Sequence, residues 1–271
     1  MPRIVIKISA NLSTLFRDLP WSERFDAARA GGFDGVEIQF PYAEPAEALA
    51  RAARSAALPL ILINGPVDPP EHPLGIACRP DLRAAFRAQL PRIEEYALAL
   101  GARYVHVLAG RIDPEVDRAS LLRVYVENLM CSAERLRAHG IEVLVEPLNA
   151  HDAPGYLIDS FDTAAEVIRL SGPGIGLQFD VYHAARMRVD LLDEIERRLP
   201  LIRHIQFADA PGRHQPGTGN VPFEPLIAKL LEARYSRWLG AEYFPIGAAQ
   251  ESLRWMADWR ARLRTRRPGA A

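Results

Sequence analysis

Eight short apolar segments recur along the chain, and they constrain its fold more than any other feature. Most are continuously apolar rather than alternating, which is typical of strands buried on both faces of a parallel sheet. Such a sheet needs helices to cover its outer face. The segments are residues 4–9 (IVIKIS), 35–40 (GVEIQF), 60–63 (LILI), 104–108 (YVHVL), 143–146 (VLVE), 175–180 (IGLQFD), 204–209 (HIQFAD) and 238–243 (WLGAEY).

Segments with the apolar spacing of helices lie between these predicted strands, and several stop at a glycine, namely Gly31, Gly101 and Gly140. Eight strand and helix units predict an α/β fold, a closed (β/α)8 TIM barrel, for which 271 residues is an ordinary length. A doubly wound sheet is the alternative. It would be favoured by a glycine-rich phosphate loop, and neither GxGxxG nor GxxxxGK[S/T] occurs.

No low-complexity linker divides the chain, so we expect a single TIM-barrel domain over residues 1–271. The last residues, from about 260 to 271 (RARLRTRRPGAA), are locally basic. A short basic terminus is more often a solvated end than a binding arm. We therefore expect these residues to form a flexible tail.

The overall charge gives no reason to expect nucleic acid or a membrane surface as a partner. The chain has 33 basic and 34 acidic residues, a formal net charge of -1. Cys78 and Cys131 are isolated, which fits a reducing compartment. The N-terminal apolar run is too short for a signal sequence, and no segment approaches membrane-spanning length, so a cytoplasmic protein is expected. Assembly into a homo-oligomer is left open.

Polar side chains follow the last four predicted strands, at Glu146, Asp180, Gln206 and Glu242. The carboxyl ends of barrel strands form the active-site face, so these four side chains should meet at one mouth. Three carboxylates in one place repel each other unless a cation neutralises them. Oxygen ligands suit a hard divalent ion such as Mg²⁺ or Mn²⁺. Taken singly, each residue is more simply interpreted as a solvated loop residue or a helix cap. Taken together, the four residues predict an ion site.

Two residues in the loops after these strands are candidates for substrate binding. His183 lies three residues after Asp180, close enough to approach the same ion or a substrate, although a single loop histidine is usually a surface residue. Arg213 lies on a Gly/Pro-rich loop, where its guanidinium would match a substrate carboxylate or would simply face solvent.

Three further polar residues lie within the predicted strands. His204 and His106 are interpreted as inward-pointing, hydrogen-bonded core histidines rather than ligands. Glu37 ends the segment GVE and is either an acid that orients a site residue or a buried partner of a neighbouring polar group.

The segments SANLSTLF, AGGFDGVEIQFPY, EPLN, DAPGYLI, QFDVYH, HIQFADAPGRHQPGTGN and WLGAEYFP resemble the hydroxypyruvate isomerase family, within the xylose-isomerase-like barrels. The resemblance covers residues 9 to 245. It implies that Glu146 and Glu242 transfer protons and that His183 and Arg213 face a small hydroxy or oxo acid. The ion ligands that it implies are Glu146, Asp180, Gln206 and Glu242. The chain departs from the family at Gln215 and Asn220, where acids are expected beside PGTG.

The resemblance predicts interconversion of hydroxypyruvate and tartronate semialdehyde through an enediolate, stabilised by the cation. The alternatives on the same scaffold are a 2-oxo-tetronate isomerase and a ketose 3-epimerase. An abasic-site endonuclease is a more distant alternative, since it needs more histidine ligands for zinc and a basic groove. A barrel that only binds sugar acids is a minor one, because the glutamate pair is intact.

Overall fold

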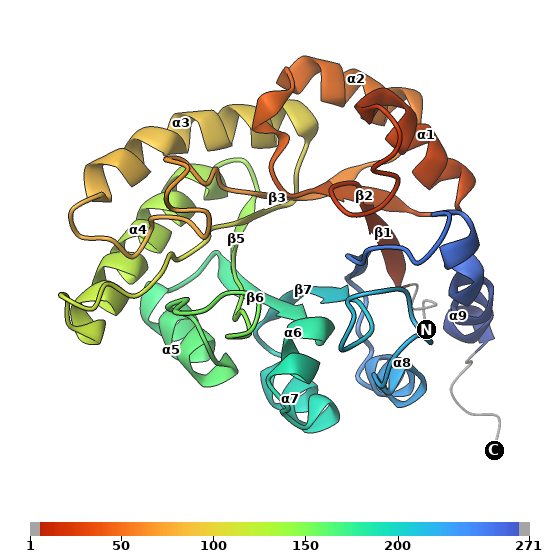
Figure 1. The fold of residues 1–271 in the computed structure, drawn as a ribbon. Coiled ribbons are helices and arrows are strands. Elements are labelled where there is room, and N and C mark those ends of the chain that lie inside the picture. Colours follow the sequence, from red (N-terminus) through yellow and green to blue (C-terminus); the bar gives the residue numbers. More distant parts are fainter. Residues whose placement is uncertain (1–5, 266–271) are drawn as a thin grey trace.

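Residues 6–265 are described by the computed structural model, and within them eight parallel strands form a closed barrel (Figure 1). The strands follow one another around the barrel in chain order, and pairing of Ile8 with Leu239 closes it. The predicted (β/α)8 barrel is confirmed. The strands are β1 (Lys7–Asn11), β2 (Gly35–Ile38), β3 (Leu60–Asn64), β4 (Tyr104–His106), β5 (Glu142–Val145), β6 (Ile175–Asp180), β7 (Ile202–Phe207) and β8 (Trp238–Ala241).

Helices surround the barrel and connect its strands, with two helices between β6 and β7 (Figure 1). Asp117, Ser160 and Asp190 begin three of them by accepting backbone N–H groups of the first turn. Among the described helices, none is both long and apolar enough to cross a membrane. The helices are α1 (Trp21–Ala30), α2 (Ala46–Ser55), α3 (Arg83–Leu100), α4 (Arg118–Arg137), α5 (Phe161–Ser171), α6 (Val181–Arg186), α7 (Leu191–Arg198), α8 (Phe223–Glu232) and α9 (Trp255–Thr265), with 3-10 turns η1 (Pro41–Ala43) and η2 (Glu251–Arg254).

The inner face of the barrel has an apolar part and a polar part. On β5, Leu144 belongs to a small second cluster of buried side chains, whereas Val143 and Val145 belong to the large core, because successive strand side chains point to opposite faces. The rest of the second cluster is Ile61, Leu62, Tyr104 and Trp238. The buried polar side chains of the barrel strands include Glu37, His106, Gln178, His204 and Gln206, each at most 1% exposed. The polar part leads to the carboxyl ends of the strands.

The C-terminal segment differs from the expected tail. Residues 260–265 are helical, because α9 continues to Thr265. Leu263 is buried, and Trp259 packs against Phe207 and Phe223 with ring centroids 4.8 Å and 5.3 Å apart. These apolar contacts hold α9 on the barrel wall despite its basic side chains. The remaining tail residues, 266–271, lie outside the described residues.

Candidate active site

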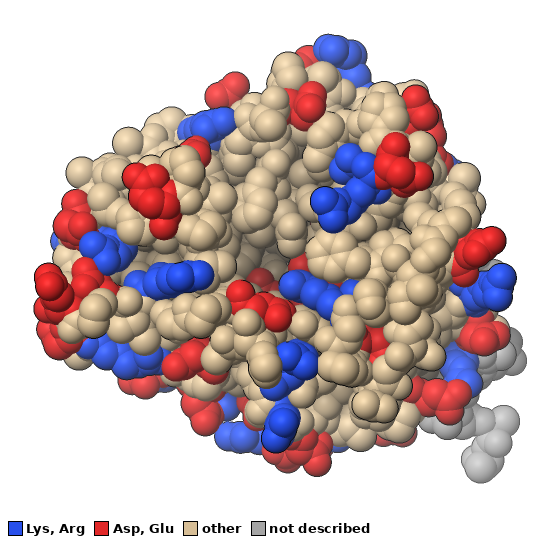
Figure 2. Space-filling model, viewed as in Figure 1, with Lys and Arg blue, Asp and Glu red and all other residues tan. Residues whose placement is uncertain are grey.

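The four predicted strand-end residues gather at one mouth because of the register of the sheet. Asp180 of β6 pairs directly with Gln206 of β7. Glu242 lies one residue beyond Ala241, the last pairing position of β8, and Glu146 lies one beyond Val145 of β5. All four side chains are buried, between 1% and 6% exposed. Viewed toward this mouth, the molecular surface is hollowed at its centre, with acidic and basic side chains at the rim (Figure 2).

Glu242 is the most strongly fixed of the carboxylates. It accepts hydrogen bonds from Asn11 Nδ2 at 2.8 Å and from Gln39 Nε2 at 3.0 Å. Gln206 Nε2 and Arg213 Nη2 each donate to it at 2.6 Å. Four donors from different segments leave this side chain little freedom, so Glu242 is held in one orientation at the mouth.

A layer of buried polar groups beneath Gln206 fixes its amide. Gln206 Nε2 donates to Glu37 at 2.8 Å, and Gln206 Oε1 accepts from Gln178 Nε2 at 2.6 Å. His204 Nε2 lies 2.9 Å from Glu37, and the Ser9 hydroxyl donates to the same carboxylate. Burial opposes ionisation of Glu37, but the pKa is still lowered because His204 and these donors stabilise the charged form. Glu37 therefore supports Gln206 from below. His204 and His106 are both buried as expected, but the hydrogen bonding expected of His106 is not found, since neither of its ring nitrogens has a hydrogen-bond partner within residues 6–265.

Glu146, Asp180 and His183 form a cluster of potential metal ligands at the mouth, since one potential ligand atom of each lies within 4.8 Å of the others. Asp180 Oδ1 caps α6 by accepting from Tyr182 N at 2.7 Å. Asp180 Oδ2 is buried without a hydrogen-bond partner in residues 6–265. His106 Nδ1 lies 3.4 Å from Glu146, so this histidine belongs to the floor of the site as well as to the core.

The tautomer of His183 follows from its contacts. Its Nδ1 accepts from the backbone N–H of Asn149 at 3.1 Å. Burial and the charge of Arg213 lower the pKa of His183 well below its usual value, so the ring is neutral and carries its single proton on Nε2. Nε2 lies 3.8 Å from Asp180 Oδ2. The ring is thus a hydrogen-bond donor toward the mouth, which suits a substrate oxygen better than a metal ion.

Arg213 links the two halves of the site. Its Nη2 lies 2.6 Å from Glu242 and 3.5 Å from Asp180, and the guanidinium lies 4.9 Å from the centre of the Tyr182 ring. Arg213 has a φ of 58°, in the left-handed region that non-glycine residues seldom adopt. Strong local contacts must therefore hold the loop that carries it.

Asp209 supplies those contacts. Its buried carboxylate accepts five backbone N–H groups, from residues 210, 217–219 and 221, at 2.8–3.0 Å. Gly219 is required there, because a Cβ at this position would lie 2.0 Å from the carbonyl oxygen of Ala210. Residues 210–221, the Arg213 loop, thus close around one carboxylate, which fixes where Arg213 enters the mouth.

Burial raises the pKa of all three carboxyl groups at the mouth. The pKa of Glu146 is well above its usual value, and the charges of Asp180 and Glu242 raise it further. The pKa values of Asp180 and Glu242 are also raised, the latter to about 8, although Arg213 opposes both shifts. The single positive charge of Arg213 is therefore not enough to stabilise all three carboxyl groups in their ionised forms.

A comparison with known protein families agrees with the fold. The family model of the xylose isomerase-like TIM barrel matches residues 25–259. The chain belongs to this family.

Relatives of this xylose isomerase-like barrel match nearly its whole length. The 2-oxo-tetronate isomerase of Pectobacterium atrosepticum is 36% identical over 255 residues, which are 93% of this chain and 97% of that protein. A putative hydroxypyruvate isomerase of Homo sapiens is 38% identical over 263 residues, 94% of this chain and 95% of that protein. A crystal structure described as AP endonuclease, family 2, from Brucella melitensis is 36% identical, with a TM-score of 0.89, and covers 95% of this chain and 99% of that one.

The donor set of this xylose isomerase-like barrel fits a hard divalent cation. Carboxylate oxygens dominate the mouth, and Asp180 Oδ2 is an acceptor without a donor within the described part of the chain. Glu146 and Asp180 would hold the ion directly. Glu242 and the oxygen of Gln206 are already engaged by hydrogen-bond donors, although a carboxylate or amide oxygen with a second lone pair is still able to act as a ligand.

Raising the pH should destabilise the protein in the presence of a chelator. Glu242 has an ordinary pKa of 4.5, and the fold raises it to about 8. Between these values the unfolded chain releases a proton that the folded protein keeps. The free energy of unfolding should therefore fall with rising pH, by at most about 1.4 kcal/mol per unit for this group. Thermal melts between about pH 5 and pH 8 measure the slope.

Glu242→Gln should make this slope shallower, because glutamine does not titrate, while Glu146 and Asp180, whose pKa values are also raised, keep their contributions. Glu71→Gln, at an exposed loop position, is the matched control and should keep it. Added Mg²⁺ should reduce the slope in the wild type, since an ion favours the ionised carboxylates. A Glu242→Gln variant with the wild-type slope would contradict the assigned protonation of Glu242.

Sequence reasoning missed the groups that orient the site, chiefly the donors Asn11, Gln39 and Gln178 and the acceptor Asp209. Asn11 ends β1 and Gln39 follows β2. In a barrel, polar residues at the carboxyl ends of strands lie on the active-site face, which we call the strand-end rule. Applying this rule to the first two strands as well as the last four would have found both residues.

Proposed function

We propose that this chain is an isomerase of small hydroxy and oxo acids that interconverts hydroxypyruvate and tartronate semialdehyde. The observation that carries the proposal is the pair of buried glutamates, Glu146 and Glu242, which project from β5 and β8 into one mouth beside Arg213. The names of the relatives, hydroxypyruvate isomerase and 2-oxo-tetronate isomerase, support the same reaction type.

The site requires a divalent ion, for which we propose Mg²⁺ or Mn²⁺. Its ligands would come from Glu146, Asp180, Gln206 and Glu242, with Asp180 Oδ2 the most available oxygen. When bound, the ion supplies electrostatic stabilisation of the negative charge that develops on the substrate oxygens. It would also favour the ionised forms of the two glutamates, which their burial otherwise disfavours.

The two glutamates act as proton carriers. One glutamate, as the carboxylate, takes a proton from C3 of hydroxypyruvate and gives an enediolate. The proton of the C3 hydroxyl passes to the C2 oxygen, and the other glutamate, as the carboxylic acid, gives a proton to C2, which yields tartronate semialdehyde. Asn11, Gln39 and Gln206 hold Glu242 in place for this transfer. Among the described residues, Glu146 is approached by His106 at 3.4 Å and by the side chain of Gln178, fewer donors than hold Glu242, so its orientation depends more on the ion and the substrate.

His183 and Arg213 bind the substrate in this scheme. His183 Nε2–H donates to a substrate oxygen, and its tautomer is fixed by the backbone N–H of Asn149. Arg213 pairs with the substrate carboxylate through N–H groups not already used on Glu242, since Arg213 Nε is buried and has no partner within residues 6–265.

A DNA-repair reaction is the rival suggested by the Brucella melitensis structure. Zinc sites of that kind need several histidine ligands, and binding to DNA is favoured by an excess of positive charge. Here the cluster of potential metal ligands found among the described residues contains one histidine, His183, and the net charge of the chain is -1. These features favour the isomerase.

Parallel assays separate the candidates. The purified protein with Mg²⁺ is given hydroxypyruvate, a 2-oxo-tetronate, D-fructose and a DNA duplex with an abasic site. We expect the highest kcat/KM with hydroxypyruvate. A higher value with the 2-oxo-tetronate would change the substrate but keep the reaction class, whereas strand cleavage without isomerisation would refute the proposal.

Arg213→Ala should raise KM for hydroxypyruvate far more than KM for an uncharged ketose. A charge-assisted hydrogen bond contributes about 1.5–3 kcal/mol, which corresponds to a factor of about 10 to 150. Arg87→Ala, an exposed arginine on α3, is the control and should change neither value. Steady-state kinetics on both substrates measure the effect, and equal losses would show that Arg213 does not bind the carboxylate.

A further inference from the structure

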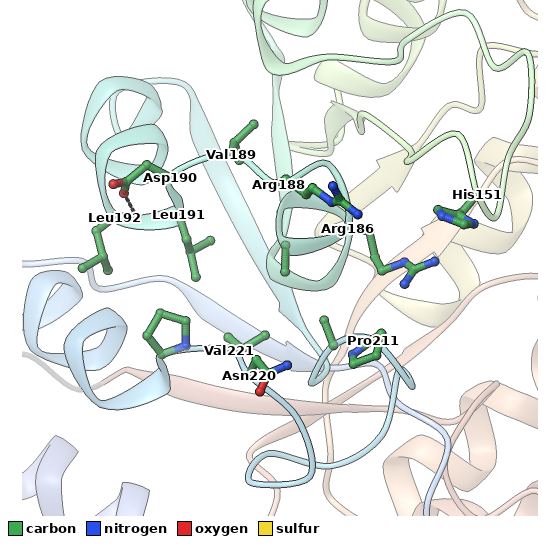
Figure 3. Close-up of a pocket in the computed structure, with 13 residues that line it drawn as sticks. His151, Arg186, Arg188, Val189, Asp190, Leu191, Leu192, Pro211, Asn220 and Val221 are labelled. Atoms are coloured by element: carbon green, nitrogen blue, oxygen red, sulfur yellow. Dashed lines mark hydrogen bonds between the residues drawn. The ribbon is translucent and has the colours of Figure 1, made fainter.

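A cavity of about 660 Å³ lies beside the proposed catalytic mouth, between the C-terminal end of α6 and both ends of the Arg213 loop (Figure 3). We call it the α6 pocket. It is lined by His151, Arg186 and Arg188 on one side and includes Pro211 and Asn220 of the loop. It is distinct from the ion site, since none of the proposed ion ligands lines it.

Two unpaired arginines face this cavity. Within residues 6–265, neither Arg186 nor Arg188 has a carboxylate partner within 4.0 Å, unlike Arg213. Arg186 Nε is also buried and lacks a hydrogen-bond acceptor. A buried donor without an acceptor is costly and rare in native proteins, so an acceptor from outside the chain is expected to complete it. Figure 3 shows the guanidinium groups of Arg186 and Arg188 on the same side of the cavity as His151.

The acid in the lining does not neutralise these arginines. Asp190 accepts backbone N–H groups of Leu192 and Asp193, both at 3.0 Å, and so caps α7. In Figure 3 it lies at the other end of the cavity from Arg186 and His151. The positive charge at the arginine end is therefore available to a ligand.

Apart from Asp190, which caps α7, the other end of the α6 pocket is lined mainly by apolar side chains. Leu191, Leu192, Val221 and Pro222 belong to its lining, from the start of α7 and the end of the Arg213 loop. A ligand matching both ends has an anionic head and a short apolar part.

We propose that the α6 pocket binds a small organic anion, a phosphate or carboxylate attached to a short apolar group. The head would accept from Arg186 and Arg188, and the apolar part would lie against Leu191 and Val221. This site goes beyond the proposed isomerase function and does not depend on it. Because Arg186 follows His183 by one turn of α6 and Pro211 precedes Arg213 by two residues, the occupant contacts segments that carry both substrate-binding residues.

Isothermal titration calorimetry tests the proposal with two probes, inorganic phosphate and n-butyl phosphate, at constant ionic strength. Butyl phosphate should bind several-fold more tightly, because each buried methylene strengthens binding. The double variant Arg186→Gln/Arg188→Gln should weaken both probes about tenfold or more through loss of charge-assisted hydrogen bonds. Thermal melting checks that the double variant is folded. The single variant Arg188→Gln, at an exposed position, should lose less affinity for both probes than the double variant does.

Two controls locate the binding. Arg29→Gln/Arg87→Gln removes the same charge at exposed positions of α1 and α3 and should leave both affinities unchanged. Arg213→Ala should also leave them unchanged, whereas loss of binding there would place the anion in the catalytic mouth and overturn the proposal. Failure of both probes to bind the wild type at millimolar concentration would overturn it as well. Equal affinities for the two probes would overturn the assignment of an organic ligand.

Discussion

Glu146→Gln should lower kcat for hydroxypyruvate by about 10²–10⁴-fold, the usual contribution of a positioned general base. Glutamine keeps the size and one ligand oxygen of glutamate but does not accept a proton, so proton transfer is lost while the architecture remains. In the wild type the Glu146 side chain is buried, with His106 as a neighbour at 3.4 Å. Steady-state kinetics and a thermal melt on the same sample measure both effects.

Glu142→Gln is the matched control on the same strand. Glu142 lies at the opposite end of β5 and pairs with Arg203 at 2.9 Å, away from the mouth. The loss of this partly exposed ion pair should cost at most about 1 kcal/mol of stability and leave kcat unchanged. A Glu146→Gln enzyme that melts normally and turns over at the wild-type rate would remove Glu146 from the mechanism.

Asp180→Asn should weaken binding of Mn²⁺ and lower kcat by about 10²–10³-fold, the size of effect expected when electrostatic stabilisation of a developing oxyanion is lost. Asparagine keeps an oxygen that caps α6 at the backbone N–H of Tyr182, so the helix should persist. The change replaces Oδ2, which has no hydrogen-bond partner within residues 6–265 and lies 3.5 Å from Arg213 Nη2, with a neutral amide group. Calorimetric titration with Mn²⁺ measures the affinity of each variant for the ion. Activity assays with a chelator and with added ion measure how far kcat depends on the ion.

Asp26→Asn, at an exposed position of α1, removes the same charge far from the ion site and should leave Mn²⁺ affinity unchanged. Equal Mn²⁺ affinity of Asp180→Asn and the wild type would exclude Asp180 as a ligand. Full activity of the wild type after exhaustive chelation would exclude an ion from the reaction.

The barrel and the position of its mouth were predictable because both follow from simple periodicities. Continuous apolar strands separated by helices specify a parallel sheet with covered faces. The strand-end rule then placed Glu146, Asp180, Gln206 and Glu242 on one face, and the register of Asp180 with Gln206 brings them together as expected. His183 follows in the first turn of α6, so its proximity to Asp180 is also local.

Other parts of the site depend on contacts between distant residues, which spacing does not reveal. Asn11 donates to Glu242 across 231 positions of the chain, and Gln206 donates to Glu37 across 169. The Arg213 loop folds around Asp209 through five backbone N–H groups, and irregular loops have no periodicity to signal such a structure. The helical state of residues 260–265 was missed for a related reason, because Trp259 and Leu263 pack on distant elements.

Deuterium incorporation tests the central claim, that two glutamates carry protons through an enediolate, most directly. The wild-type enzyme with Mg²⁺ converts hydroxypyruvate in heavy water, and ¹H NMR follows C2 of the tartronate semialdehyde formed. Because one glutamate removes a proton from C3 and another delivers one to C2, the new hydrogen at C2 should come from solvent, and the product should carry deuterium there. Product formed at the normal rate without deuterium at C2 would indicate direct transfer of hydrogen between the carbons and would contradict the proposed roles of Glu146 and Glu242.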